Sequence, residues 1–198
     1  NYVTLGKAEE DYTMGLNNTI RYKRLSLGFN FDFRHGGLMY SATKSTLYFT
    51  GNAEETMYNL RDPWIYPNSV IQVGKDGAGN PVYAENDRPI NSFYNVHGLY
   101  NDSNNYSVYR DFLIDKTYVK LRELNISYTL PDKWFENVRW LSSINVSLVG
   151  RNLLMWTPKQ GLVDPDNTNY GNDLTSQYGE YFSAPSTRTF GGSVKIVF

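Results

Sequence analysis

The acidic run from Asp164 to Asn169 is the part of this 198-residue chain that most resembles a metal-binding loop. Closely spaced carboxylate and amide oxygens ligate calcium in an EF-hand, which also needs glycine at its sixth position and glutamate at its twelfth. Asn169 and Thr175 occupy those two positions here. We therefore interpret the run as a turn and expect no metal site.

Residue types for other catalytic chemistry are absent or wrongly spaced. The chain has no cysteine, and its two histidines, His35 and His97, are isolated in the sequence. Thiolate chemistry is therefore excluded, and no nucleophile elbow is present. The glycines within 74–79 lack the spacing of a phosphate-binding loop. We interpret acidic pairs such as Glu54-Glu55 as solvated surface, and we expect no enzyme activity and no cofactor.

Composition points to a surface that is partly wet and partly apolar. The formal net charge is -1 and the pI is about 6.2, so no basic field indicates nucleic acid. Aromatic residues make up 16% of the chain, with 17 tyrosines, although the mean hydropathy is -0.51. Tyrosine is enriched at interfaces and in membrane belts. The sequence contains no run of 18 apolar residues, so it predicts no transmembrane helix.

Alternation of apolar and polar residues predicts five strands. It is strictest over 25–34, within an expected first strand that spans 19–34, and the His35-Gly36-Gly37 turn should lead into a second strand over 38–50. The other strands are expected at 118–130, 143–156 and 186–198. Val119 and Leu121 have the opposite parity to Leu124 and Ile126, which indicates a β-bulge between them.

Connections between these strands alternate between short and long, so all long loops should leave one side of the sheet. This asymmetry is typical of outer-membrane barrels, which have short periplasmic turns and long extracellular loops. Aromatic residues near both strand ends fit interfacial girdles: Tyr128, Trp134, Phe135 and Trp140 at one end and Trp156 at the other. The expected segments are the end of an extracellular loop (1–18), a barrel hairpin (19–50), a long extracellular loop (51–107), a second hairpin (108–156), another extracellular loop (157–185) and the terminal strand (186–198).

Five strands cannot close into a barrel, because small closed barrels need about eight strands. An open sheet with an apolar face and two bare edges would aggregate. We therefore expect an all-β, antiparallel transmembrane barrel segment that pairs with further strands of a longer protein. The alternative is a soluble all-β glycan-binding module, in which the same aromatic residues form a sandwich core or a sugar site.

Four local motifs, taken in order, resemble the carboxy-terminal part of SusC/RagA-type TonB-linked outer-membrane transporters of Bacteroidota. They are Leu121-Arg122-Glu123-Leu124 leading to Tyr128-Thr129-Leu130-Pro131, the Gly150-Arg151-Asn152-Leu153-Leu154 run, Asp164-Pro165, and Pro185-Ser186-Thr187-Arg188. The resemblance implies that the five strands are the last five of a 22-stranded barrel, a number within the range of such barrels. It also implies an outer-membrane location.

The resemblance implies a function and partners as well. The family imports oligosaccharides or peptides, driven by TonB, together with a SusD-like surface lipoprotein that acts as a lid. TonB contact would require an upstream region that this chain does not contain. The terminal aromatic strand would be read by the barrel-assembly machinery, with Phe198 as the signal and Phe190, Val194 and Ile196 on the same face; outer-membrane lipid would surround the barrel.

Two further sets of residues are candidates for contact with substrate. The polar strand faces would line the lumen, with Asn30, Asp32, Arg34, Asn125, Ser127, Asn145, Ser147, Arg151, Ser193 and Lys195. Aromatic residues of the expected loops would stack on sugars or pack against the lid: Trp64, Tyr66, Tyr83, Tyr94, Tyr100, Tyr106 and Tyr109.

Overall fold

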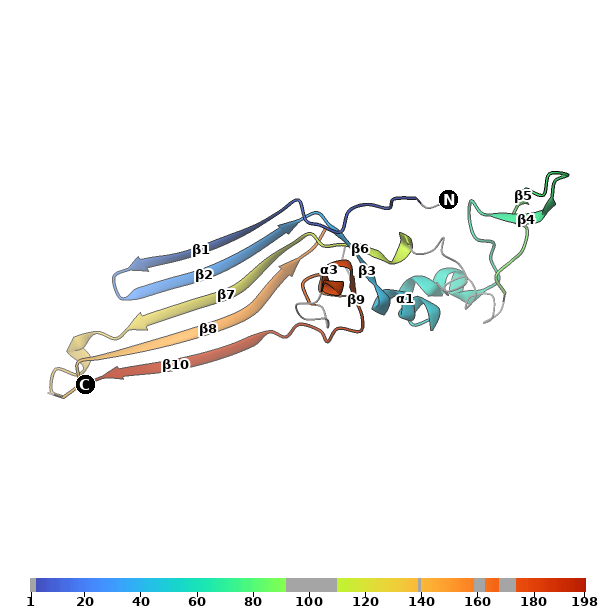
Figure 1. The fold of residues 1–198 in the computed structure, drawn as a ribbon. Helices are drawn as coiled ribbons and strands as arrows, with labels where there is room; N and C mark the ends of the chain where they lie inside the picture. The colour runs from blue at the N-terminus through green and yellow to red at the C-terminus, as the bar shows by residue number, and fades with distance from the viewer. Residues whose placement is uncertain (1–2, 92–109, 139, 159–162, 168–173) are drawn as a thin grey trace. The chain divides into compact units, whose positions relative to one another are not determined.

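The computed structural model describes residues 3–91, 110–138, 140–158, 163–167 and 174–198 (Figure 1). The chain forms two compact units. The first contains Asn1–Ser41 and Leu113–Phe198, and the second contains Ala42–Phe112.

The first unit is built on a five-stranded antiparallel sheet with the order β1-β2-β7-β8-β10 (Figure 1). Its strands lie side by side, and β1 and β10 form its two edges. The antiparallel all-β fold expected from the sequence is thereby confirmed, with an open sheet. The strands are β1 (Tyr12–Tyr22), β2 (Leu25–His35), β7 (Tyr118–Thr129), β8 (Ser143–Trp156) and β10 (Thr189–Val197).

The strand expected over 19–34 is in fact a hairpin, which corrects the first boundary. Lys23 adopts a positive φ of 53°, and the chain reverses between β1 and β2. Residues 12–18, expected to be loop, belong to β1 and pair with β2 up to Tyr12 opposite His35. Glycine and asparagine are depleted in strands, and β1 contains Gly15, Asn17 and Asn18. Pairing with the strongly alternating β2 outweighs that weak local preference.

The prediction of a second strand over 38–50 is also wrong. Only β3 (Leu38–Ser41) is extended, and Ala42–Phe49 forms helix α1. Gly36 and Gly37 have φ of 76° and 84°, and they lead the chain out of the large sheet instead of into a hairpin. A Cβ on Gly37 would lie 2.9 Å from the Ala8 carbonyl oxygen, so this path requires glycine.

Strand β3 is the central strand of a small three-stranded sheet. Its neighbours are β6 (Leu113–Asp115), which is antiparallel, and β9 (Gly179–Glu180), which is parallel. Buried polar groups next to this sheet are paired: Glu180 accepts a hydrogen bond from the Ser41 hydroxyl, and the Lys116 ammonium lies 2.8 Å from Glu10. The short helix α3 (Thr175–Tyr178) precedes β9.

Short and long connections still alternate in the observed sheet. Residues 23–24 join β1 to β2, and 130–142, with the turn η3 (Asp132–Trp134), join β7 to β8. Long segments, 36–117 and 157–188, make the other two connections. Arg24 ties the two short turns together, since its guanidinium donates to the Leu130 carbonyl at 2.7 Å and pairs with Asp132 at 3.2 Å. The carboxy-terminus lies at this same end of the sheet (Figure 1).

The strand register separates the side chains of the sheet into two faces. Residues directly opposite one another share a face. One face consists of apolar rows that run across the strands and contain no Asp, Glu, Lys or Arg. Three such rows are Tyr22–Leu25–Tyr128–Val146–Val194, Ile20–Leu27–Ile126–Leu148–Gly192 and Leu16–Phe31–Leu121–Leu154.

This apolar face is not buried by other described parts of the chain. Phe190 is 78% exposed, Leu148 63% and Ile20 54%. Monomeric soluble proteins rarely expose apolar patches of this kind. The face therefore needs an apolar environment supplied from outside the chain. Among the described residues, no helix has the length and apolarity needed to cross a membrane.

The second unit contains helical and hairpin elements. Helix α1 is followed by the 3-10 helix η1 (Glu54–Arg61) and by the hairpin of β4 (Val70–Lys75) and β5 (Pro81–Glu85). Asp76 closes the hairpin turn, since its carboxylate accepts bonds from the backbone N–H groups of Ala78 and Asn80. A bridge between Trp64 and Ile90 brackets the hairpin. The long connection between β2 and β7 thus contains a local subdomain.

A charge placed on the apolar face tests whether hydrocarbon covers it. We expect Phe29→Arg in the full-length protein to reduce the amount of folded barrel in outer-membrane fractions strongly, because arginine on a lipid face costs about 2–4 kcal/mol near the midplane. Asn30→Arg on the opposite face is the matched control and should assemble normally. Gel-shift quantification of folded protein distinguishes the two variants; equal assembly of both would contradict lipid coverage.

Candidate functional site

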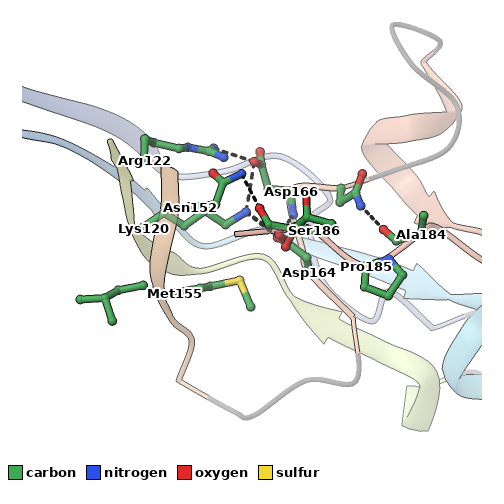
Figure 2. A pocket seen from close by; sticks show the side chains of 12 residues that line it. Lys120, Arg122, Asn152, Met155, Asp164, Asp166, Ala184, Pro185 and Ser186 are labelled. Carbon is green, nitrogen blue, oxygen red and sulfur yellow. Dashed lines mark hydrogen bonds and ion pairs between the residues drawn. The ribbon is translucent and has the colours of Figure 1, made fainter. Parts of the chain in front are cut away.

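A pocket of about 320 Å³ lies where four motifs from distant parts of the sequence meet (Figure 2). Strand β7 contributes Lys120 and Arg122, β8 contributes Asn152, Leu154 and Met155, and the long β8–β10 connection folds back to contribute the rest. We call this region the motif junction. The connection's lining residues are Asp164, Asp166, Asn167, Ala184, Pro185, Ser186 and Thr187.

A β-bulge in β7 positions Arg122. Glu123 lies opposite Asn30 and Leu121 lies opposite Phe31, so Arg122 is an extra residue relative to β2. Bulges redirect side chains near functional sites and barrel rims. The bulge reverses the alternation of side chains along β7. The Arg122 guanidinium consequently bonds to Asp32 on the polar face. The bulge expected between Leu121 and Leu124 is therefore confirmed.

Strand β8 is irregular at the level of this bulge. Leu121 pairs with Leu154 and Glu123 pairs with Arg151, so Asn152 and Leu153 lie outside the regular ladder. Asn152 has a φ of 52°, a conformation that asparagine tolerates better than most residues. Its amide donates to the Thr187 carbonyl at 3.3 Å. Gly150 leaves room for Leu153, because a Cβ on Gly150 would lie 2.8 Å from that side chain.

Ion pairs attach the β8–β10 connection to β7. The Lys120 ammonium donates to both oxygens of Asp164, at 2.6 and 2.8 Å, and lies 3.2 Å from Asp166. The Arg122 guanidinium donates to Asp166 at 2.6 Å (Figure 2). The side chains of Lys120 and Asp164 are each only 6% exposed. A buried charge is stable only when it is paired and hydrogen-bonded, so these groups depend on one another.

The network continues into β2. Arg122 donates to Asp32 at 2.5 and 3.0 Å, and the Tyr118 hydroxyl donates to Asp32 at 3.0 Å. Arg34 lies 3.4 Å from Asp166, and its guanidinium lies over the Tyr118 ring, 5.0 Å from the ring centroid. Three cations (Arg34, Lys120 and Arg122) therefore face three carboxylates (Asp32, Asp164 and Asp166).

The protonation of Asp166 reflects this pairing. Burial alone would raise the pKa of Asp166, but the charge of Lys120 and the hydrogen bond from Arg122 outweigh it and hold this pKa below its ordinary value. The Asp164 carboxylate also accepts a bond from the Asp166 backbone N–H at 3.0 Å, which shapes the turn expected for this run. In the described ranges, no group of three His, Cys, Asp or Glu side chains is arranged to hold a metal ion.

The expected lumen residues share one face of the sheet. Register places Asn30, Asp32 and Arg34 of β2 on the face opposite the apolar rows, together with the candidates from the other strands. Asp32 and Arg34 belong to the charged network. The others lie further along the same face: Asn125, Ser127, Asn145, Ser147, Arg151, Ser193 and Lys195. Arg151 pairs with Glu123 at 3.1 Å, and Asn145 donates to the Thr129 hydroxyl at 3.0 Å.

The expected aromatic contact residues are only partly within the described ranges. The Trp64 and Tyr66 rings lie 5.5 Å apart, and Tyr83 on β5 is exposed. Burial and the nearby Asp111 raise the pKa of Tyr66. Tyr94, Tyr100, Tyr106 and Tyr109 lie outside the described residues. The described aromatic residues belong to the second unit and are not part of the motif junction.

The terminal strand residues lie as the alternation predicts. Phe190, Val194 and Ile196 are on the apolar face of β10. Phe198 follows the strand, and its ring stacks on Trp140 with centroids 5.5 Å apart. Their role as an assembly signal stays a prediction.

Sequence reasoning missed the charged side chains that hold the junction together. Lys120 and Arg122 were within a predicted strand and Asp164 and Asp166 within a predicted turn, but their pairing joins segments separated by more than forty positions. The parity change beside Arg122 was a signal, because bulges redirect side chains near functional sites. The identity of the anionic partner of Arg122 was not visible in the local pattern.

Comparisons with known proteins cover nearly the whole chain. No protein-family model matches it. TonB-dependent receptor P26 of Formosa agariphila is 24% identical over 99% of the chain, and TonB-dependent receptor P3 of the same organism is 28% identical over 98%. The chain spans 18% and 17% of the lengths of these two relatives.

Solved structures with a similar fold belong to the RagAB peptide importer. Its open-open state has a TM-score of 0.56, 19% identity and 94% coverage of this chain, which corresponds to 17% of that chain. The closed-closed state has a TM-score of 0.57, 18% identity and 96% coverage, corresponding to 18% of that chain. These matches agree with the outer-membrane location expected from the sequence. In sequence and in fold, the chain is similar to a portion of a TonB-dependent transporter of the SusC/RagA type.

Proposed function

We propose that this chain is part of the wall of a TonB-dependent outer-membrane transporter that imports oligosaccharides or peptides. The observation that carries the proposal is the two-faced sheet, in which uncovered apolar rows lie behind a polar face rich in charged and amide side chains. Lipid would cover the apolar rows, and the polar face would line a water-filled lumen. A soluble module would instead need a second layer over the apolar rows.

A SusD-like surface lipoprotein is the partner we propose for the long connections. The similarity to the RagAB peptide importer supports this partner class. The half-buried Trp64 and Tyr66 and the exposed Tyr83 suit a contact with either a lid or a substrate, because aromatic side chains are enriched at interfaces. TonB would act through an upstream region, and the barrel-assembly machinery would read the terminal strand.

The motif junction has a positioning role in this proposal. Its ion pairs fix residues 163–167 against the polar face of β7, so the β8–β10 connection would begin its path inside the lumen. Such a segment narrows the passage and presents its own side chains to whatever passes.

Transport by the full-length protein tests the proposal directly. We expect deletion of its gene to abolish uptake of one labelled class, oligosaccharide or peptide, and collapse of the proton gradient with a protonophore to have the same effect in the intact strain. Purification in mild detergent should also recover a surface lipoprotein in stoichiometric amount. Uptake that survives both treatments would contradict TonB-driven import.

Acid should release the segment that the junction holds. The folded-state pKa of Asp166 is lowered, so its stabilising contribution is present above its unfolded pKa of about 3.9 and is lost as the pH falls through the lower folded value. Asp166→Asn should release residues 163–167 already at neutral pH. Each charged hydrogen bond that this substitution removes lowers the stability of the attached segment by about 1.5–3 kcal/mol. A spin label on Val163→Cys reports the release as increased mobility.

The exposed Asp132 provides the control for this experiment. Asp132→Asn removes a carboxylate that pairs with Arg24 far from the junction, and the label should stay immobile at neutral pH. An Asp166→Asn protein whose label is as immobile as in the parent would show that the ion pairs do not hold the segment.

A further inference from the structure

The β8–β10 connection is attached to the first unit at a second place besides the motif junction. There the Lys116 ammonium donates to the Gln177 carbonyl at 3.4 Å, and β9 pairs with β3. The buried Glu180 accepts a hydrogen bond from the Ser41 hydroxyl. We call this region, defined by Lys116, Gln177 and Glu180, the sheet attachment. The described parts of the connection are thus held both at the junction and at the small sheet.

Glu10 is the carboxylate that these two attachments share. One of its oxygens lies 2.8 Å from the Lys116 ammonium at the sheet attachment and 3.6 Å from the Arg34 guanidinium. Arg34 in turn lies 3.4 Å from Asp166 of the motif junction. Within the described ranges, Glu10 is the one carboxylate that pairs with Lys116, and it is one of two that pair with Arg34.

Burial makes both cations dependent on Glu10. The Lys116 side chain is only 3% exposed, and a buried charge that loses its partner is strongly destabilising. The Nε atom of Arg34 is buried and has no hydrogen-bond partner among the described residues, so the Glu10 carboxylate 3.6 Å away supplies its compensating charge. Removing the charge of Glu10 therefore weakens the pairing of both cations at once.

The backbone on either side of Glu10 is fixed to the fold. The Leu38 N–H donates to the Lys7 carbonyl at 2.9 Å, and the Asp11 N–H donates to the His35 carbonyl at 2.8 Å. These bonds hold the segment before β1 in place and keep the Glu10 carboxylate beside its two cations. A movement of this segment would withdraw Glu10 from both attachments together.

We propose that Glu10 is a positioning residue that couples the motif junction to the sheet attachment. Residues within one ion-pair network act non-additively, so a change at Glu10 reaches both ends of the network. The segment before β1 thereby controls how firmly the β8–β10 connection is held. The inference deepens the positioning role of the junction and rests on the proposed function for its consequence, which is that displacement of this segment frees a connection that narrows the passage.

Spin labels on the full-length transporter in detergent measure this coupling, with any other cysteines replaced. One protein carries the label on Val163→Cys at the junction. A second carries it on Leu174→Cys, an exposed position whose carbonyl accepts a bond from the Gln177 N–H. We expect Glu10→Gln to shorten the rotational correlation time of both labels at least twofold.

Variants at the two ends of the network separate shared from local effects. Arg34→Gln removes the cation next to the junction and should release only the label at 163. Lys116→Gln removes the cation of the sheet attachment and should release only the label at 174. Release of both labels by Arg34→Gln would show that Glu10 is not the coupling residue.

Glu9→Gln is the matched control, because Glu9 is the neighbouring carboxylate, is exposed and pairs with no described cation. Both labels should stay as immobile as in the parent protein. The coupling is overturned when either label keeps its parent mobility in Glu10→Gln, or when Glu9→Gln has an equal effect. Glu10→Asp, which keeps the charge but shortens the side chain by one methylene, replaces Glu10→Gln under the same criteria when the latter gives no folded protein by gel shift.

Failure of this inference can be told apart from failure of the proposed function, because the labels report without transport. TonB-driven uptake by a protein whose labels do not respond to Glu10→Gln refutes the coupling alone. Labels that respond as expected in a protein that supports no uptake refute the transport function alone.

Discussion

The structure depends on one constraint: five strands expose a continuous apolar face that no described part of the chain covers. Rows such as Ile20–Leu27–Ile126–Leu148 extend across β1, β2, β7 and β8 without a charged side chain. Apolar area exposed to water costs roughly 25 cal/mol per Å², so a sheet of this kind is stable only in an apolar environment. The opposite face carries amides and ion pairs, such as the pair between Lys120 and Asp164.

The two-faced sheet explains why the charged network lies where it does. Side chains along a paired strand alternate between the two faces of the sheet. Regular alternation would therefore place Arg122 on the apolar face, together with Leu124. The bulge at Arg122 changes this alternation locally, so that the guanidinium bonds to Asp32 and Asp166 on the polar face. Gly150, Asn152 and the Asp164-Pro165-Asp166 turn are the matching adjustments in β8 and in the connection that follows. Motifs that appear unrelated along the chain thus serve one junction.

Local patterns predicted the parts of the fold that local physics determines. The alternation in β2, β7, β8 and β10 identified those strands, and the parity change located the bulge. The first strand was missed because Gly15, Asn17 and Asn18 weaken its intrinsic preference, and only pairing with β2 makes it extended. Helix α1 was missed because Leu47, Tyr48 and Phe49 suit a strand as well as a helix. The ion pairs of Lys120 and Arg122 were beyond reach, since their partners come from a separate segment whose return path is set by tertiary structure.

Alternating accessibility along β2 tests the central claim most directly. The chain has no cysteine, so single cysteines placed in turn at positions 25–34 of the full-length protein can each carry a spin label in lipid bilayers, with any cysteines elsewhere in the protein replaced. We predict that labels at 25, 27, 29, 31 and 33 collide with oxygen, which partitions into hydrocarbon, and that labels at 26, 28, 30, 32 and 34 do not. A profile without period two, or water-soluble relaxation reagents reaching the odd positions, would contradict a lipid-covered face.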